Sequence, residues 1–124
     1  MAGSATVLVV DDDPAMRTIV SLSLKLYSYV VLVAGSGEEA LRVARDHPEI
    51  RVIILDVVMS GLAGTELAAQ LKTSLPGAAI LFCSGHPASA LARYGVEANP
   101  ANFLQKPCRA LELQQKIEEL MATC

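Results

Sequence analysis

Short runs of apolar residues alternate along this chain with longer segments whose apolar positions recur every three or four residues. Five runs have the length of a strand: residues 6–10, 29–33, 52–55, 78–83 and 102–105. The runs at 7–10 and 52–55 contain only Val, Ile and Leu, which is typical of strands buried on both faces of a parallel sheet. The pattern therefore predicts five strands.

The segments between these runs predict helices with recognisable ends. Asp13 followed by Pro14 is typical of an N-cap and an N1 proline. The apolar positions that follow recur at helical spacing: Met16, Ile19, Val20, Leu24 and Tyr27. Ser36 and Glu39 form a capping box, so a second helix is predicted to begin there and to end at His47 and Pro48.

Three further helices are expected in the second half of the chain. One covers 65–74, with Leu67, Leu71 and Leu75 on one face, and is stopped by Pro76 and Gly77. Another covers 88–94. A terminal helix has an inner stripe of four residues: Leu113, Ile117, Leu120 and Met121.

Five strands alternating with five helices predict an α/β fold in which helices cover both faces of a parallel sheet. We expect a flavodoxin-like, doubly wound (βα)5 sandwich of three layers with strand order 2-1-3-4-5. A length of 124 residues fits one domain spanning 1–124, with a core at about 5–121, and has no room for a second catalytic domain.

Composition excludes several classes of protein. A hydrophobic content of 52% with 19% charged residues indicates a folded interior. The net charge of −3, the scattered Lys and Arg and the 4% of aromatic residues give no reason to expect nucleic acid as a partner. No apolar run is long enough to span a membrane and no signal peptide is recognisable, so we expect a cytoplasmic protein. Cys83, Cys108 and Cys124 have neither disulfide nor zinc-site spacing.

Chemically capable residues follow four of the five strand runs. Asp11 and Asp12 follow the first run, Asp56 the third, Ser84 the fourth and Lys106 the fifth. In an open parallel sheet, ligands bind beyond the carboxyl ends of the strands, and this strand order makes the first and third strands neighbours. The acids at 11, 12 and 56 are therefore expected to share one site. Asp13 needs only its role as a helix cap.

Four motifs resemble those of the receiver domain of two-component response regulators, including receiver modules of hybrid histidine kinases. They are the acidic pair in 9–12, Leu55-Asp56-Val57-Val58-Met59 with Gly61 and Gly64, Ser84-Gly85, and Phe103-Leu104-Gln105-Lys106-Pro107. The resemblance covers residues 5–121. Each motif alone is weak, but they occur together, in order and at strand ends.

The resemblance implies a phosphorylatable signalling module rather than a separate enzyme. Asp56 would take a phosphoryl group from the phosphohistidine of a histidine kinase or histidine phosphotransfer domain. Mg²⁺ would be bound by Asp12, Asp56 and the backbone carbonyl of Val58, with Asp11 acting mainly through a metal-bound water. A hard divalent cation is needed because a carboxylate and a phosphoryl group repel each other.

The resemblance also implies a conformational switch. Lys106 and the Ser84 hydroxyl would contact phosphoryl oxygens, and movement of Ser84 would make room for Phe103 to turn inward. This would alter the surface of the last two helices and the last strand, and so would change binding to a downstream protein or domain. Simple alternatives exist for two of these residues: Ser84 as a turn residue and Phe103 as a core residue. A monomer or weak dimer is expected.

Two other classes of protein use related residues. A haloacid dehalogenase-type Mg²⁺-dependent phosphatase would use Asp11 as nucleophile and Asp13 as general acid, but Pro14-Ala15 lacks the Thr or Val that follows in that motif. A flavodoxin-type cofactor binder would need a hydroxyl-rich phosphate loop after the first strand. Three acids stand there instead and would repel a phosphate.

Overall fold

The structure is a computed structural model that describes residues 5–56, 64–84, 102–105 and 109–122. Within these ranges the strands are β1 (Thr6–Val10), β2 (Val30–Ala34), β3 (Ile50–Asp56), β4 (Ala79–Ser84) and β5 (Phe103–Gln105). The helices are α1 (Pro14–Lys25), α2 (Gly37–Asp46), α3 (Gly64–Ser74) and α4 (Ala110–Ala122).

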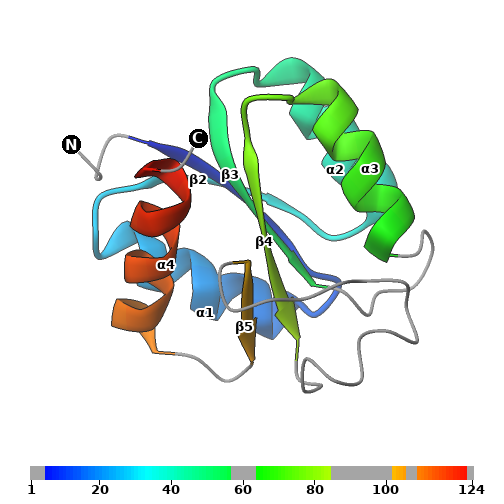
Figure 1. Ribbon diagram of the computed structural model, residues 1–124. Coiled ribbons are helices and arrows are strands. Elements are labelled where there is room, and N and C mark those ends of the chain that lie inside the picture. The colour runs from blue at the N-terminus through cyan, green and yellow to red at the C-terminus, as the bar shows by residue number, and fades with distance from the viewer. Residues whose placement is uncertain (1–4, 57–63, 85–101, 106–108, 123–124) are drawn as a thin grey trace.

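All strand pairings are parallel, and the sheet has the order β2-β1-β3-β4-β5. Helices α2 and α3 cover one face of the sheet, and α1 and α4 cover the other (Figure 1). The predicted three-layer, flavodoxin-like sandwich is therefore confirmed. The helix expected over 88–94 lies outside the described residues.

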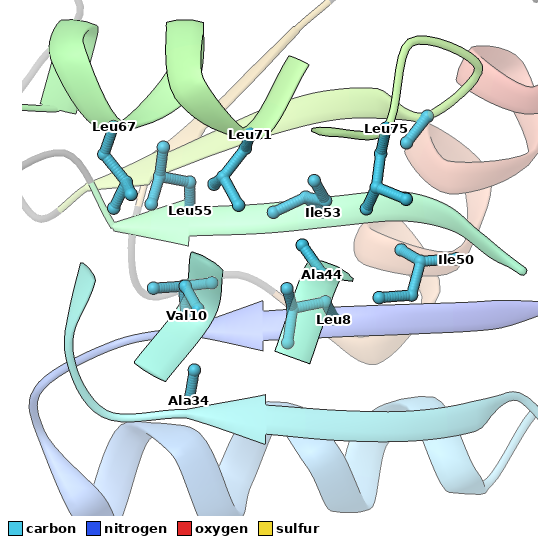
Figure 2. Packing of buried hydrophobic residues seen from close by; sticks show 12 residues of the cluster. Leu8, Val10, Ala34, Ala44, Ile50, Ile53, Leu55, Leu67, Leu71 and Leu75 are labelled. Carbon is cyan, nitrogen blue, oxygen red and sulfur yellow. The ribbon is translucent and has the colours of Figure 1, made fainter. Parts of the chain in front are cut away.

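The central strands are buried on both faces because their side chains alternate between two helical layers. Leu8 and Val10 of β1 pack in the cluster under α2 and α3, whereas Val7 and Val9 pack in the cluster under α1 and α4. Figure 2 shows the first cluster, where Leu67 and Leu71 of α3, together with Leu75 just after it, lie over the side chains of β3. This explains why no polar residue interrupts the runs at 7–10 and 52–55.

The predicted helix starts are confirmed by their caps. The Asp13 side chain accepts a hydrogen bond from the Ala15 amide at 3.0 Å, with Pro14 in the first turn. The Ser36 hydroxyl accepts from the Glu39 amide at 3.1 Å. Glu39 differs from the usual capping box: its carboxylate accepts from the Gly35 amide, one residue before the cap, at 2.6 Å.

The packed face of α1 differs from the apolar positions in the sequence. Val20, Ser21 and Leu24 are buried, while Ile19 is 56% exposed. Successive helical residues are about 100° apart, so Ile19 lies about 200° from Ser21 and faces away from the packed side of the helix. On α4, Leu113 and Ile117 are buried and Leu120 and Met121 only partly so.

The second strand runs from Val30 to Ala34, one residue later than predicted. Tyr29 precedes it and is buried among the residues under α1 and α4. Burial raises the pKa of Tyr29, and the negative charge of Glu118 adds to this shift. No helix among the described residues is long and apolar enough to cross a membrane.

Candidate functional site

The site begins at the carboxyl end of β1, where the backbone of Asp11 continues the sheet by one further bond. Its amide donates to the Ala34 carbonyl at 3.1 Å. The Asp11 carboxylate accepts from the Asp13 amide at 3.0 Å and is almost fully buried, with 3% of the residue exposed. Asp12 is exposed to solvent. The two acids thus occupy different environments at one strand end.

Asp56 is brought beside this pair by the register of the neighbouring strand. Val10 of β1 is aligned with Leu55 of β3, so the acids that follow, Asp11 and Asp56, lie next to each other. One carboxylate oxygen from each of Asp11, Asp12 and Asp56 lies within 4.8 Å of the other two. The acidic cluster predicted from the strand order is therefore present.

The donor set of this cluster suits a hard divalent cation. Mg²⁺ and Ca²⁺ are bound in proteins through oxygen, and the three carboxylates here offer oxygen only. An octahedral Mg²⁺ holds its ligand oxygens roughly 3 to 4 Å apart, so the spacing of the cluster needs little closure. A cation also offsets the repulsion among three neighbouring negative charges. The residues present therefore fit a metal ion.

Ser84 lies at the carboxyl end of β4, the strand next to β3. The residue is fully buried, with 0% exposed, and the preceding Cys83 is aligned with Asp56. Ser84 itself is aligned with Gln105, the last residue of β5. The structure therefore places a buried hydroxyl residue one strand away from the acidic cluster.

The remaining predicted site residues come from the edge of the sheet or from outside the described ranges. Phe103 begins β5, is aligned with Phe82 and is partly buried. Lys106 and Val58 lie outside the described residues, so their predicted roles stay predictions.

The sequence did not predict that the positively charged side chain of Arg17 lies at this end of the sheet. Arg17, in the first turns of α1, donates from Nη1 to the backbone oxygen of Asp11 at 2.8 Å. An arginine on an amphipathic helix is usually a solvated residue, so its sequence position carries little signal. Only the folding of α1 back along β1 and β2 brings it to the acidic end.

Comparison with known proteins gives a consistent family. The family model described as the response regulator receiver domain matches residues 7–118. The sensor kinase CckA of Brucella abortus is 33% identical over 122 residues, which are 98% of this chain and 13% of that protein. The response regulator MprA of Mycobacterium leprae is 35% identical over 116 residues, 93% of this chain and 50% of that protein. The chain thus spans half or less of these two relatives.

Solved structures agree with the family model. A response regulator receiver domain protein from Clostridium thermocellum has a TM-score of 0.84 at 26% identity, covering 97% of this chain and 96% of the other. A response regulator from Burkholderia pseudomallei, solved with a phosphorylated aspartic acid, a calcium ion and citrate, has a TM-score of 0.78 at 27% identity, covering 97% and 72%.

These matches leave the haloacid dehalogenase-type phosphatase without support. The strand order, the acidic cluster at the ends of β1 and β3 and the match over residues 7–118 all point to the same family. The chain belongs to the response regulator receiver domains, the signalling modules of two-component systems.

Proposed function

We propose that Asp56 is the phosphoacceptor of this receiver domain. A carboxylate oxygen of Asp56 attacks the phosphorus of a phosphohistidine on a histidine kinase or histidine phosphotransfer domain. A P–O bond to Asp56 forms as the P–N bond breaks, and the imidazole leaves with the electron pair of that bond. The observation that carries the proposal is the placement of Asp56 within 4.8 Å of both acids at the end of β1.

The cluster favours Asp56 over Asp11 as the nucleophile. Asp11 is 3% exposed and its carboxylate already accepts the Asp13 amide, so it is poorly placed to reach an incoming phosphoryl group. Asp56 ends β3 and is partly buried, which leaves it accessible from the rim of the sheet. The phosphorylated aspartic acid in the Burkholderia pseudomallei relative supports an aspartyl phosphate in this fold.

Mg²⁺ is the proposed cofactor: Asp12, Asp56 and the backbone carbonyl of Val58 would hold it directly, and Asp11 would act mainly through a metal-bound water. When bound, it offsets the charge that builds up as an anionic phosphoryl group meets three carboxylates. The protein contributes a rim of fixed oxygens, and Lys106 is proposed to balance part of the remaining negative charge.

Ser84 and Phe103 are the proposed switch residues. Phosphorylation would add about −1.5 to −2 units of charge at Asp56. The Ser84 hydroxyl would donate a hydrogen bond to one of the phosphoryl oxygens. Because Ser84 lies in β4 next to β5, its displacement would be passed to Phe103 and to the surface that β5 shares with α4 and with the helix expected over 88–94. A downstream protein or domain would read that surface.

The domain would work as a cytoplasmic signalling module, a monomer or weak dimer, that promotes only its own phosphorylation and dephosphorylation. The relatives include a sensor kinase and a response regulator, so the receiver could act alone or within a longer chain.

The test is to incubate the protein with Mg²⁺ and acetyl phosphate and to map the modified residue by mass spectrometry. We expect one phosphoryl group on Asp56 and none in Asp56→Asn. Asp46→Asn, which removes an exposed acid at the end of α2, is the matched control and should be labelled normally. Labelling of Asp11 instead would overturn the proposal and return the protein to the phosphatase class.

A further inference from the structure

Asp11 is held at three points, and two of them involve residues outside its own turn. Its amide is bonded to Ala34 and its carboxylate to the Asp13 amide. The third bond joins its backbone oxygen to Nη1 of Arg17 at 2.8 Å. A hydrogen bond from a charged donor is stronger than one between neutral groups. This bond fixes the peptide group that links Asp11 to Asp12.

The Arg17 guanidinium also lies against Gly35, the residue that follows β2. A Cβ atom added to Gly35 would lie 2.8 Å from Arg17 Nη1, closer than real Cβ contacts allow, and 3.3 Å from Cζ. The φ angle of Gly35 is outside the left-handed region, so space rather than backbone strain limits this position. The Gly35 amide is in turn bonded to Glu39 of α2 at 2.6 Å. The guanidinium is thus confined between the ends of β1 and β2.

We infer that Arg17 is a positioning residue for the metal-binding end of β1, and that Gly35 provides the space its guanidinium occupies. The inference rests on the proposed function, because it concerns the same acidic cluster. Rotation of the peptide between Asp11 and Asp12 would move both carboxylates, so the Arg17 bond holds them in place before a cation arrives. Groups that orient metal ligands in this way typically contribute about 10- to 100-fold to metal affinity.

Two possible roles of Arg17 have opposite effects on the affinity for Mg²⁺. A nearby positive charge repels Mg²⁺, so an arginine acting only through its charge would weaken binding, and its removal would tighten it. An arginine that positions Asp11 and Asp12 would strengthen binding in spite of its charge. The sign of the change in affinity therefore separates the two roles.

The experiment measures the Kd of Mg²⁺ by titrating the isotope-labelled protein with Mg²⁺ and following its amide chemical shifts. We expect Arg17→Met to weaken binding about tenfold and Arg17→Lys, which keeps the charge and one donor, to recover part of the loss. Arg42→Met removes the same charge from an exposed site on α2 and should change the Kd less than about twofold. In metal-free Arg17→Met, the amides of Asp12 and Asp13 should lose protection from hydrogen exchange.

Gly35→Ala tests the same contact with the arginine still present. The new Cβ atom would displace the Arg17 guanidinium, so Mg²⁺ binding should be weaker than in the wild type, as in Arg17→Met. In the double variant Arg17→Met/Gly35→Ala the second change should add little, because the group it displaces is already gone. This arm remains informative if Arg17→Met folds poorly.

The outcomes separate the inference from the function on which it rests. With acetyl phosphate, the Mg²⁺ concentration for half-maximal labelling of Asp56 should rise in Arg17→Met, while the rate at saturating Mg²⁺ stays close to wild type. Unchanged or tighter Mg²⁺ binding in Arg17→Met, with normal labelling of the wild type, would overturn the positioning role alone. A wild-type protein that neither binds Mg²⁺ nor is labelled at Asp56 would overturn the proposed function.

Discussion

Asp11 and Asp56 end two adjacent parallel strands, far apart in the sequence, and bring carboxylate oxygens within 4.8 Å of each other. Their environments differ, because Asp11 is buried and bonded to the Asp13 amide whereas Asp56 is partly exposed at the rim. In the proposed function, the buried Asp11 would help to hold the metal ion and Asp56 would accept the phosphoryl group.

Mg²⁺ should stabilise the folded protein, because the cluster of Asp11, Asp12 and Asp56 exists only when β1 and β3 are paired. At a free Mg²⁺ concentration of 100 times the Kd, the free energy of unfolding should rise by about 2.7 kcal/mol, and a chelator should reverse the gain. Urea unfolding with and without Mg²⁺ measures this increase in the free energy of unfolding.

In Asp12→Asn the increase caused by Mg²⁺ should be severalfold smaller at the same Mg²⁺ concentration. The metal-free variant should keep its stability, because the substitution removes one of three charges that repel each other. An equal gain in Asp12→Asn would place the metal elsewhere.

Ser84→Ala should separate phosphorylation from the response of β5. Asp56 keeps its place in β3, so labelling by acetyl phosphate should persist, but the hydroxyl that would draw β4 toward the phosphoryl group is missing. Amide shifts of Phe103 and Leu104 on addition of beryllofluoride and Mg²⁺ should fall to a fraction of the wild-type shifts. Ser23→Ala is the control, since its hydroxyl is bonded to the Ile19 carbonyl within α1. Full-sized shifts in Ser84→Ala would remove Ser84 from the switch.

The Tyr29 hydroxyl should make the protein sensitive to alkali. Because burial raises the pKa of Tyr29 in the folded state, the unfolded chain releases this proton first as the pH increases. The stability linked to this group is therefore complete below the usual tyrosine pKa of 10.0 and is lost as the pH rises through the higher folded value. Stability measured by urea unfolding at pH 8 and pH 11 should fall less in Tyr29→Phe than in wild type.

Tyr27→Phe is the matched control for this alkaline effect, because Tyr27 is only partly buried. At neutral pH, Tyr29→Phe should cost little, since the buried hydroxyl has no hydrogen-bond partner among the described residues. A large loss of stability at pH 8 would show that the hydroxyl is bonded in solution.

Leu71→Ala should test the core beneath α3. Leu71 is fully buried against β3 in the cluster of Figure 2, so its truncation should lower the free energy of unfolding by about 2–5 kcal/mol. Leu22→Ala on α1, where the side chain is 58% exposed, should cost less than about 1 kcal/mol. Similar losses at both positions in urea unfolding would contradict the assigned packing.

Local patterns were enough to predict most of the secondary structure. Asp13 and Ser36 cap helices through hydrogen bonds within three residues, so residue type and short spacing are enough to predict them. The apolar runs at 7–10 and 52–55 reflect burial on two faces, which only the centre of a parallel sheet provides. The strand order then followed from general rules for α/β sheets, and with it the meeting of Asp11, Asp12 and Asp56.

Only the tertiary structure decided which side chains of each helix are buried and which residues of different elements contact each other. Both Ile19 and Val20 are apolar, and the rotation of α1 on the sheet alone determines that Val20 is buried and Ile19 exposed. The bond from Arg17 to Asp11 and the close approach to Gly35 join three separate elements, so no local spacing encodes them. The sequence by itself determined which residues stand at the strand ends, and so which are proposed to carry the chemistry, because backbone period and strand ends are local properties. The burial of these residues, their hydrogen-bond partners and the position of Arg17 beside them depend on packing, which is a property of the whole chain.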